Sequence, residues 1–124
     1  MPAQLKQEEV TAGPDEALVN EVRLVGRLSA LPEEKEMPSG DTLVAFRLVV
    51  GRPPDAKRRT TVDALECVVW TSRARRSVRS WRVDDVVEVH GALRRRFFRT
   101  AAGPASRVEV EVERARLVRR ATSG

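Results

Sequence analysis

The sequence is poor in the residues that usually carry catalytic or metal chemistry. Among 124 residues there are one cysteine, one histidine, no tyrosine and only five other aromatic side chains. A lone Cys67 cannot form an intrachain disulfide, and one histidine with one cysteine is too few for a typical metal site. Nucleophile elbows, phosphate-binding glycine loops and spaced metal ligands are missing as well. We therefore expect no enzymatic activity and no cofactor.

Long apolar segments are also missing from the sequence. No apolar run is long enough to cross a bilayer, and the first residues do not resemble a signal peptide. Hydrophobic residues make up 41% of the chain, which is enough for the core of one domain. These features predict a soluble, cytoplasmic, single-domain protein.

Arginine is what the chain has in abundance. It supplies 20 of the 23 cationic residues, and the net charge is +5. Residues 1–20 carry a net charge of −3, from Lys6 against Glu8, Glu9, Asp15 and Glu16, so the remainder carries +8. A basic body with an acidic N-terminal segment predicts a polyanionic partner.

Alternating apolar residues predict an all-β fold with one short helix. The expected strands cover residues 18–28, 42–51, 61–71, 83–98 and 107–118. We expect a loop over 30–41, a basic hairpin tip over 52–60, a helix over 72–81 and a turn over 99–106. Five strands with a helix after the third is the order of a five-stranded OB-fold barrel. Residues 1–18 are expected to form a flexible acidic arm, 19–118 the domain, and 119–124 a short basic end.

The same alternation assigns side chains to the core or to the surface. The residues expected to point inward are Leu18, Val22, Leu24, Leu28, Val44, Phe46, Leu48, Val50, Cys67, Val108, Val110 and Val112. The expected helix would bury Ala74, Val78 and Trp81, with Ser72 as its N-cap. Glu109, Glu111 and Glu113 are expected to face solvent, and Gly91 to mark a bend or bulge in its strand.

Residues 93–100 combine two adjacent rings with four arginines, in the stretch "LRRRFFRT". Phe98 shares strand parity with Arg94 and Arg96, so we expect these three on one exposed face. Phe97 has the opposite parity, together with Leu93, and is expected in the core. An exposed ring can stack on a nucleobase while arginines contact phosphates. The alternative is a strand end whose ring is buried or lies at an interface.

Five segments in order resemble the bacterial single-stranded DNA-binding proteins (SSB) over residues 19–118. They are "VNEVRLVGRL", "MPSGDTLVAFRLVV", "LECVVW", "VVEVHGALRRRFF" and "VEVEVERARLV". The resemblance implies an OB-fold, binding of single-stranded DNA without sequence preference, and a homo-oligomer, usually a homotetramer, with a dimer as the fallback. It also implies a place in DNA replication, repair or recombination.

The chain departs from the family pattern at several positions. Base-stacking aromatics carry over to Trp70 and Phe98, but two other aromatic positions hold Ala64 and the Pro53-Pro54 pair. Asp84 stands where the family has glycine. The sequence ends "RLVRRATSG", without the acidic tip by which family members recruit partners. We therefore expect a weaker, accessory DNA-binding protein.

The candidate nucleic-acid-binding residues fall into two groups. Trp70, Phe98, Arg94 and Arg96 form the first, and Arg47, Arg52, Arg58 and Arg59 lie on or beside the second-to-third-strand hairpin. The bland alternatives are a core Trp70 and a solvated basic loop. Two other functions stay open: a degenerate SSB-fold module that pairs with another SSB or a replication or repair protein, and a single-stranded RNA binder.

Overall fold

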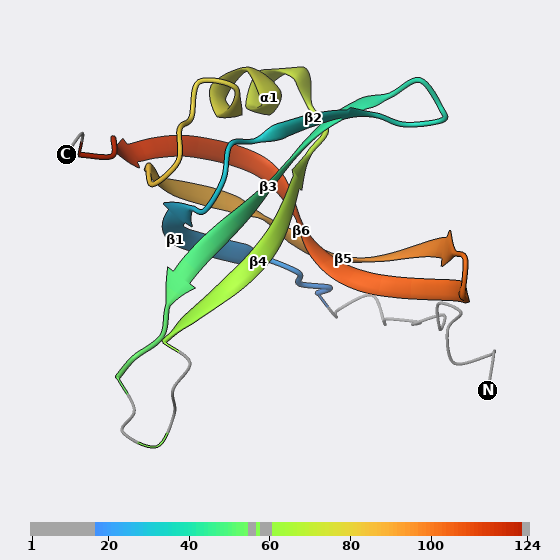
Figure 1. Ribbon diagram of the computed structural model, residues 1–124, viewed down its shortest axis with the longest axis horizontal. Coiled ribbons are helices and arrows are strands. Elements are labelled where there is room, and N and C mark those ends of the chain that lie inside the picture. Colours follow the sequence, from blue (N-terminus) through green and yellow to red (C-terminus); the bar gives the residue numbers. More distant parts are fainter. Residues whose placement is uncertain (1–16, 55–56, 58–60, 123–124) are drawn as a thin grey trace.

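The computed structural model describes residues 17–54, 57 and 61–122. Most of the expected acidic arm, and Arg58 and Arg59, lie outside the described residues. The elements follow one another along the chain as shown in Figure 1. They are β1 (Val22–Leu28), β2 (Glu33–Glu36), β3 (Thr42–Gly51), β4 (Val62–Val69), α1 (Ser72–Val78), β5 (Val86–Thr100) and β6 (Gly103–Arg119).

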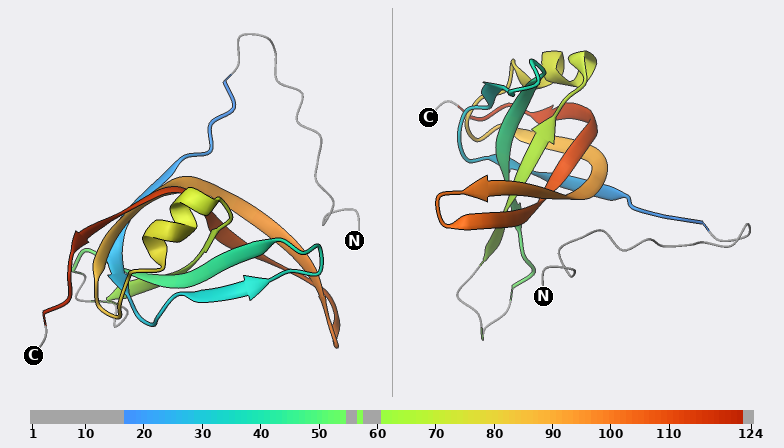
Figure 2. Two further views of the ribbon diagram at one scale, coloured as in Figure 1. Left: turned by 90° about the horizontal axis from the view of Figure 1, so that it is seen from above. Right: turned by 90° about the vertical axis from the view of Figure 1, so that its right-hand side faces the viewer.

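The strands form one strongly curled sheet. Its order is β1-β5-β6-β4-β3-β2, and β1 also pairs with β3 through Arg27–Val49 and Leu28–Leu48. Only the β4–β6 pairing is parallel among the described strands. α1 packs against β6 and β3 and covers one end of the curled sheet (Figure 2). The expected all-β architecture, with a helix between the third and fourth expected strands, is confirmed.

The expected loop over 30–41 contains a short strand, so the sheet has six strands rather than five. β2 pairs with the start of β3, from Glu33 opposite Ala45 to Glu36 opposite Thr42. A tight turn at Gly40, whose φ of +91° favours glycine, closes this hairpin. All four β2 residues are exposed and charged, as is typical of an edge strand, and this hid the strand from an apolar pattern.

The core contains most of the side chains that alternation placed there. Phe46 and Trp81 are buried and meet edge to face, with ring centroids 5.4 Å apart. Cys67 is buried too, and this burial raises the pKa of its thiol to about 12. Ala74 and Val78 anchor α1 as expected, but Thr71 rather than Ser72 is the N-cap, since its hydroxyl accepts from the Ala74 amide. Leu18 lies before β1 and is exposed, so its expected burial is wrong.

Gly91 lies where the backbones of β5 and β6 approach each other closely. The pairing shifts register between His90 and Gly91, which confirms the expected bulge. A Cβ atom built on Gly91 would lie 1.9 Å from the Glu111 carbonyl oxygen. Only glycine allows the two backbones to approach this closely, and the bend directs the remainder of both strands away from the core.

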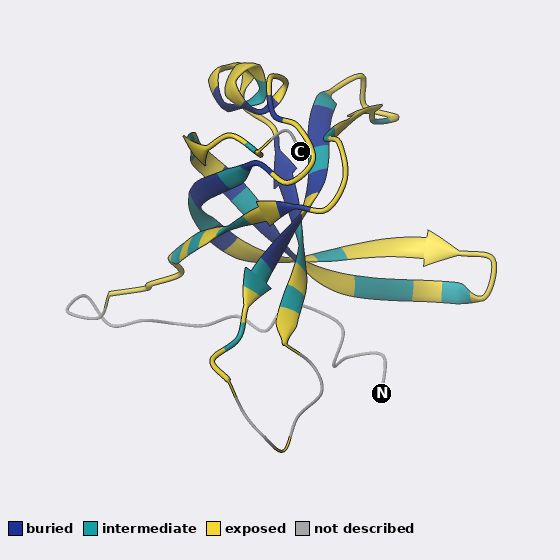
Figure 3. Cartoon of the chain, turned by 60° about the vertical axis from the view of Figure 1, so that its left-hand side comes forward, coloured by how far each residue is buried: buried dark blue, intermediate teal, exposed yellow. Residues whose placement is uncertain are grey.

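Beyond this bend, residues 94–109 form a two-stranded projection that we call the β5–β6 arm (Figure 1). The turn expected over 99–106 is wrong, because pairing continues to Thr100 opposite Gly103 and only residues 101–102 turn. Phe97, Leu93 and Val108 are 46–47% exposed, so their expected burial is also wrong. Their strand parity was right, but the arm extends past the other strands, and no other strand of the described residues covers that side (Figure 3).

The carboxylate of Glu88 points away from the core but is covered by side chains of β1, β5 and β6. Glu88 is only 4% exposed because other side chains cover it. Arg23 donates to Oε2 of Glu88 at 2.6 Å, His90 lies 3.0 Å from the same oxygen, and Arg116 pairs with Oε1. The hydrogen bond from Arg23 is the main cause that holds the pKa of Glu88 at about 2, below its ordinary 4.5; burial opposes it, and Arg116 and His90 assist.

We expect Glu88→Gln to lower stability in a pH-dependent way. A carboxyl whose pKa is lower in the folded state stabilises the fold fully above its unfolded value of 4.5. This contribution is lost as the pH falls through about 2. Urea unfolding should therefore separate parent and variant at neutral pH, and the two curves should converge in acid. Glu113→Gln, on an exposed carboxylate of β6, is the control, and a constant difference at every pH would contradict the role of Glu88.

Candidate nucleic-acid interface

The outward side chains of four strands make one continuous surface, which we call the front face. Arg47 of β3 lies opposite Glu66 of β4, Val68 of β4 beside Glu111 of β6, and Arg94 of β5 opposite Glu109 of β6. Since outward residues alternate along each strand, these pairs fix the rest of the surface. Its ring and charged members are Trp70, Phe98, Arg47, Arg94, Arg96, Arg107, Glu66, Glu109 and Glu111. Ala45, Ala64 and Ala105 lie on the same side, as do Leu43, Val49, Val68 and Ala92, which are buried.

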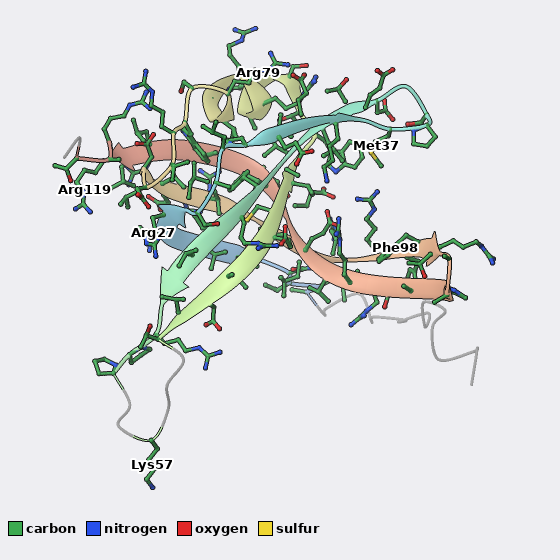
Figure 4. All side chains as sticks on the ribbon, in the orientation of Figure 1. Arg27, Met37, Lys57, Arg79, Phe98 and Arg119 are labelled. Carbon is green, nitrogen blue, oxygen red and sulfur yellow. The ribbon has the colours of Figure 1, made fainter. Side chains whose placement is uncertain are left out.

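Five of the predicted site residues share the front face. Trp70 directly follows β4, continues the alternation of Glu66 and Val68, and is 37% exposed. Phe98 is 38% exposed on the β5–β6 arm, where Figure 4 labels it. Arg94 and Arg96 lie on the same strand as Phe98, and Arg47 reaches the face from β3. The structure thus brings two exposed rings and three predicted arginines onto one surface.

Every arginine of the front face is paired with a carboxylate. Arg47 lies 2.6 Å from Glu66, Arg94 lies 3.7 Å from Glu111, and Glu109 lies 3.8 Å from Arg96 and 3.5 Å from Arg107. The four guanidinium groups and three carboxylates leave a net charge of +1. The face is therefore less basic than its arginine count suggests, and a phosphate must share these arginines with glutamates.

Glu109 corrects an expectation from the sequence. Its side chain points outward, as predicted, but only 5% of it is exposed because Arg96 and Arg107 cover it. Neither pair is close enough for a hydrogen bond to Oε1. Glu109 is thus a buried counter-ion shared by two arginines of the front face.

Arg107 also belongs to the front face, although the sequence analysis did not single it out. Its guanidinium lies 5.7 Å from the centre of the Phe98 ring, within the range of a cation–π interaction. It also lines one hollow with Arg47, Glu66, Glu33 and Lys35. With the turn expected over 99–106, Arg107 had no assigned partner; the observed register places it opposite Arg96.

Arg52, the other predicted arginine that the structure describes, does not join this group. Arg52 turns toward Asp63, whose oxygen is 2.6 Å from Nη2, and alternation puts Asp63 with Val50 on the other side of the hairpin. This hydrogen bond lowers the pKa of Asp63. Arg58 and Arg59 lie outside the described residues. The described part of the hairpin therefore contributes only Arg47 to the front face.

Two positions on or beside the front face hold no ring. Ala64 lies opposite Val49 with a methyl group only, and Pro53-Pro54 follow β3.

Asp84, where the resembled family has glycine, has a φ of +70°. This explains the family preference, because few residues other than glycine and asparagine or aspartate adopt that conformation readily.

Other kinds of site find no support in the described ranges. No group of three or more histidine, cysteine or acidic side chains there could hold a metal ion. No helix there is long and apolar enough to span a membrane.

Comparisons with known proteins agree with this picture of the fold. The model of the "Single-strand binding protein family" matches residues 19–118. The chain is 38% identical over 58 residues to Single-stranded DNA-binding protein 3 of Listeria innocua, which covers 46% of this chain and 36% of that protein. It is 30% identical over 82 residues to the Single-stranded DNA-binding protein of Halalkalibacterium halodurans. That match covers 65% of this chain and 49% of the relative. The chain thus spans about a third to a half of the length of these relatives.

A solved structure extends the likeness to three dimensions. The structure titled "Plasmodium falciparum SSB complex with ssDNA" superposes with a TM-score of 0.67 and 22% identity. The match covers 85% of this chain and 97% of the other. The expected OB-fold is therefore confirmed, with β2 as an additional strand.

Proposed function

This chain belongs to the single-strand binding protein family, and we propose that it binds single-stranded DNA on the front face without strong sequence preference. The observation that carries the proposal is the common placement of Trp70 and Phe98 as exposed rings beside Arg47, Arg94 and Arg96. Rings stack on any base, and arginines hold any phosphate, so neither contact reads sequence. We propose no catalytic step.

The paired charges of the front face shape how this binding works. Because Glu66, Glu109 and Glu111 already neutralise most of the arginine charge, attraction to a bare polyanion is weakened. Stacking on two platforms then supplies the selectivity for unpaired bases. With Ala64 and Pro53-Pro54 in place of further rings, affinity should be lower than that of a family member with more platforms.

Assembly, location and cellular process extend this proposal. We propose a homotetramer, with a dimer as the smaller alternative, in the cytoplasm and on the nucleoid when DNA is bound. A role in replication, repair or recombination and contact with another SSB or a repair protein follow from the same assignment. Arg52, Arg58 and Arg59 are proposed as additional phosphate contacts. Light scattering tests the assembly, and a monomer at micromolar concentration would contradict it.

A fluorescence titration tests the proposed binding. Oligo-dT should quench Trp70, while Trp81, which is 3% exposed, supplies a constant background. Duplex DNA should compete poorly because its bases are already stacked. Equal competition by poly-U would favour a single-stranded RNA or general single-strand binder. No response to any nucleic acid would favour the protein-interaction module.

Deleting residues 1–17 should raise affinity for oligo-dT several-fold at low salt. The deleted segment is acidic, and Asn20, which remains, hydrogen-bonds both the amide and the carbonyl of Leu93 at the base of the arm. The chain therefore reaches the fold beside the proposed DNA surface, where its carboxylates can compete with phosphates.

A charge-matched control separates competition from chain length. Replacing Glu8, Glu9, Asp15 and Glu16 by glutamine keeps the segment and removes its negative charge. It should reproduce the gain seen on deletion, and the gain should vanish at high salt. Unchanged or reduced affinity in both variants would contradict competition and leave a partner-binding role for the segment.

A further inference from the structure

The β5–β6 arm exposes rings on both of its faces. Strand alternation puts Phe98 on the front face, and puts Phe97 with Arg95 and Arg99 on the opposite side of the arm. We call this side the back face; its members are Leu93, Arg95, Phe97 and Arg99 of β5, with Pro104, Ser106 and Val108 of β6. Phe97 is 46% exposed, more than the 38% of Phe98. On β5 the back face therefore has one ring and two arginines, as the front face has Phe98 with Arg94 and Arg96 on the same strand.

The two faces differ in how their charge is compensated. On the front side of the arm, Arg94, Arg96 and Arg107 pair with Glu109 and Glu111. Among the described residues, Arg95 of the back face donates only to the Ser106 hydroxyl, at 3.1 Å, and Arg99 has no ion pair. The cross-strand partners of the back-face residues include no carboxylate. Within the part of the chain that the structure describes, the back face thus carries two cations without a carboxylate partner, against a net +1 on the front side of the arm.

We propose that the back face is a second single-stranded DNA contact surface, on which Phe97 stacks a base and Arg95 and Arg99 hold phosphates. This inference rests on the proposed function, and extends it to a strand that passes round the arm. Charge complementarity selects this occupant, because free guanidinium groups beside an exposed ring suit a chain of phosphates and flat bases. A second copy fits poorly, since a symmetric contact of the back face with itself would bring like charges together.

Three variants and a control test the back face in oligo-dT titrations over a series of lengths and salt concentrations. Phe97→Ala should weaken binding of long oligonucleotides roughly five- to 150-fold, the loss of one base–aromatic stack. The double variant Arg95→Gln/Arg99→Gln should flatten the plot of log affinity against log salt by about 1.4, which is two single-strand phosphate contacts of about 0.7 each. Phe98→Ala reports on the front face. Arg119→Gln, at the opposite end of the fold, removes one positive charge away from the arm; it is the control and should change neither the affinity nor the salt slope (Figure 4).

The outcomes separate this inference from the function on which it rests. If Phe98→Ala weakens binding while Phe97→Ala and the double variant match the parent at every length, the back face is not used and the front-face proposal stands. If the parent does not bind oligo-dT, the proposed function itself fails. If Phe97→Ala lowers the molar mass in light scattering, the back face is an interface between copies, and the inference is overturned.

Discussion

The double variant Trp70→Ala/Phe98→Ala should lose most of its affinity for single-stranded DNA. Each base–aromatic stack is worth about 1–3 kcal/mol, so removing both rings should cost about 2–6 kcal/mol, or roughly 30-fold to 10⁴-fold in dissociation constant. Both rings are more than a third exposed, so the fold should survive their removal. The salt dependence should stay nearly unchanged, because stacking releases no counterions.

Anisotropy of labelled oligo-dT measures this loss without relying on Trp70 fluorescence. The matched control is Trp70→Phe/Phe98→Tyr, which keeps a ring at both positions and should retain most of the affinity. Arg96→Ala provides the opposite signature: a smaller loss, but a salt plot flattened by about 0.7. An alanine double variant that folds and binds oligo-dT like its parent would show that the bases stack elsewhere.

The core was predictable because its residues follow a regular alternation along the strands of one curled sheet. Phe46, Leu48 and Cys67 are buried where a period of two places them, and Trp81 where a period near 3.6 does. Phe97 and Val108 follow the same rule yet are exposed. Alternation assigns a side chain to a face of a strand, but whether a face is covered depends on how far the strand extends beyond its neighbours.

The candidate site was only partly predictable for a related reason. Arg94, Arg96 and Phe98 alternate along one strand, so the sequence alone groups them on one face. That Trp70, which follows β4, shares this face depends on how the strands pair. The Arg–Glu pairs depend on register between β5 and β6, which are joined by a turn of unknown position in the sequence. Moving that turn from 99–106 to 101–102 is what pairs Arg96 with Arg107 and buries Glu109 between them.

The arm that carries Phe98 depends on the close crossing at Gly91, so Gly91→Ala should be the most damaging single change to the fold. The new methyl group would lie 1.9 Å from the Glu111 carbonyl oxygen and 2.8 Å from its carbon. Both are backbone atoms, which cannot move aside as a flexible side chain can. Separating β5 from β6 would break their pairing and disturb Val110 and Val112 in the core.

We expect Gly91→Ala to lower the free energy of unfolding by about 3 kcal/mol or more, at or beyond the upper end of ordinary overpacking. Urea unfolding followed by the fluorescence of the buried Trp81 measures this loss. The affinity for oligo-dT should fall as well, because the β5–β6 arm would no longer hold Phe98 in place. Gly51→Ala is the matched control: no atom lies within 4 Å of its added methyl group, and its φ lies outside the left-handed region. That variant should stay within about 1 kcal/mol of the parent. Equal urea midpoints for the two variants would show that β5 and β6 can separate at Gly91 without loss of stability. The position of the β5–β6 arm would then not depend on Gly91.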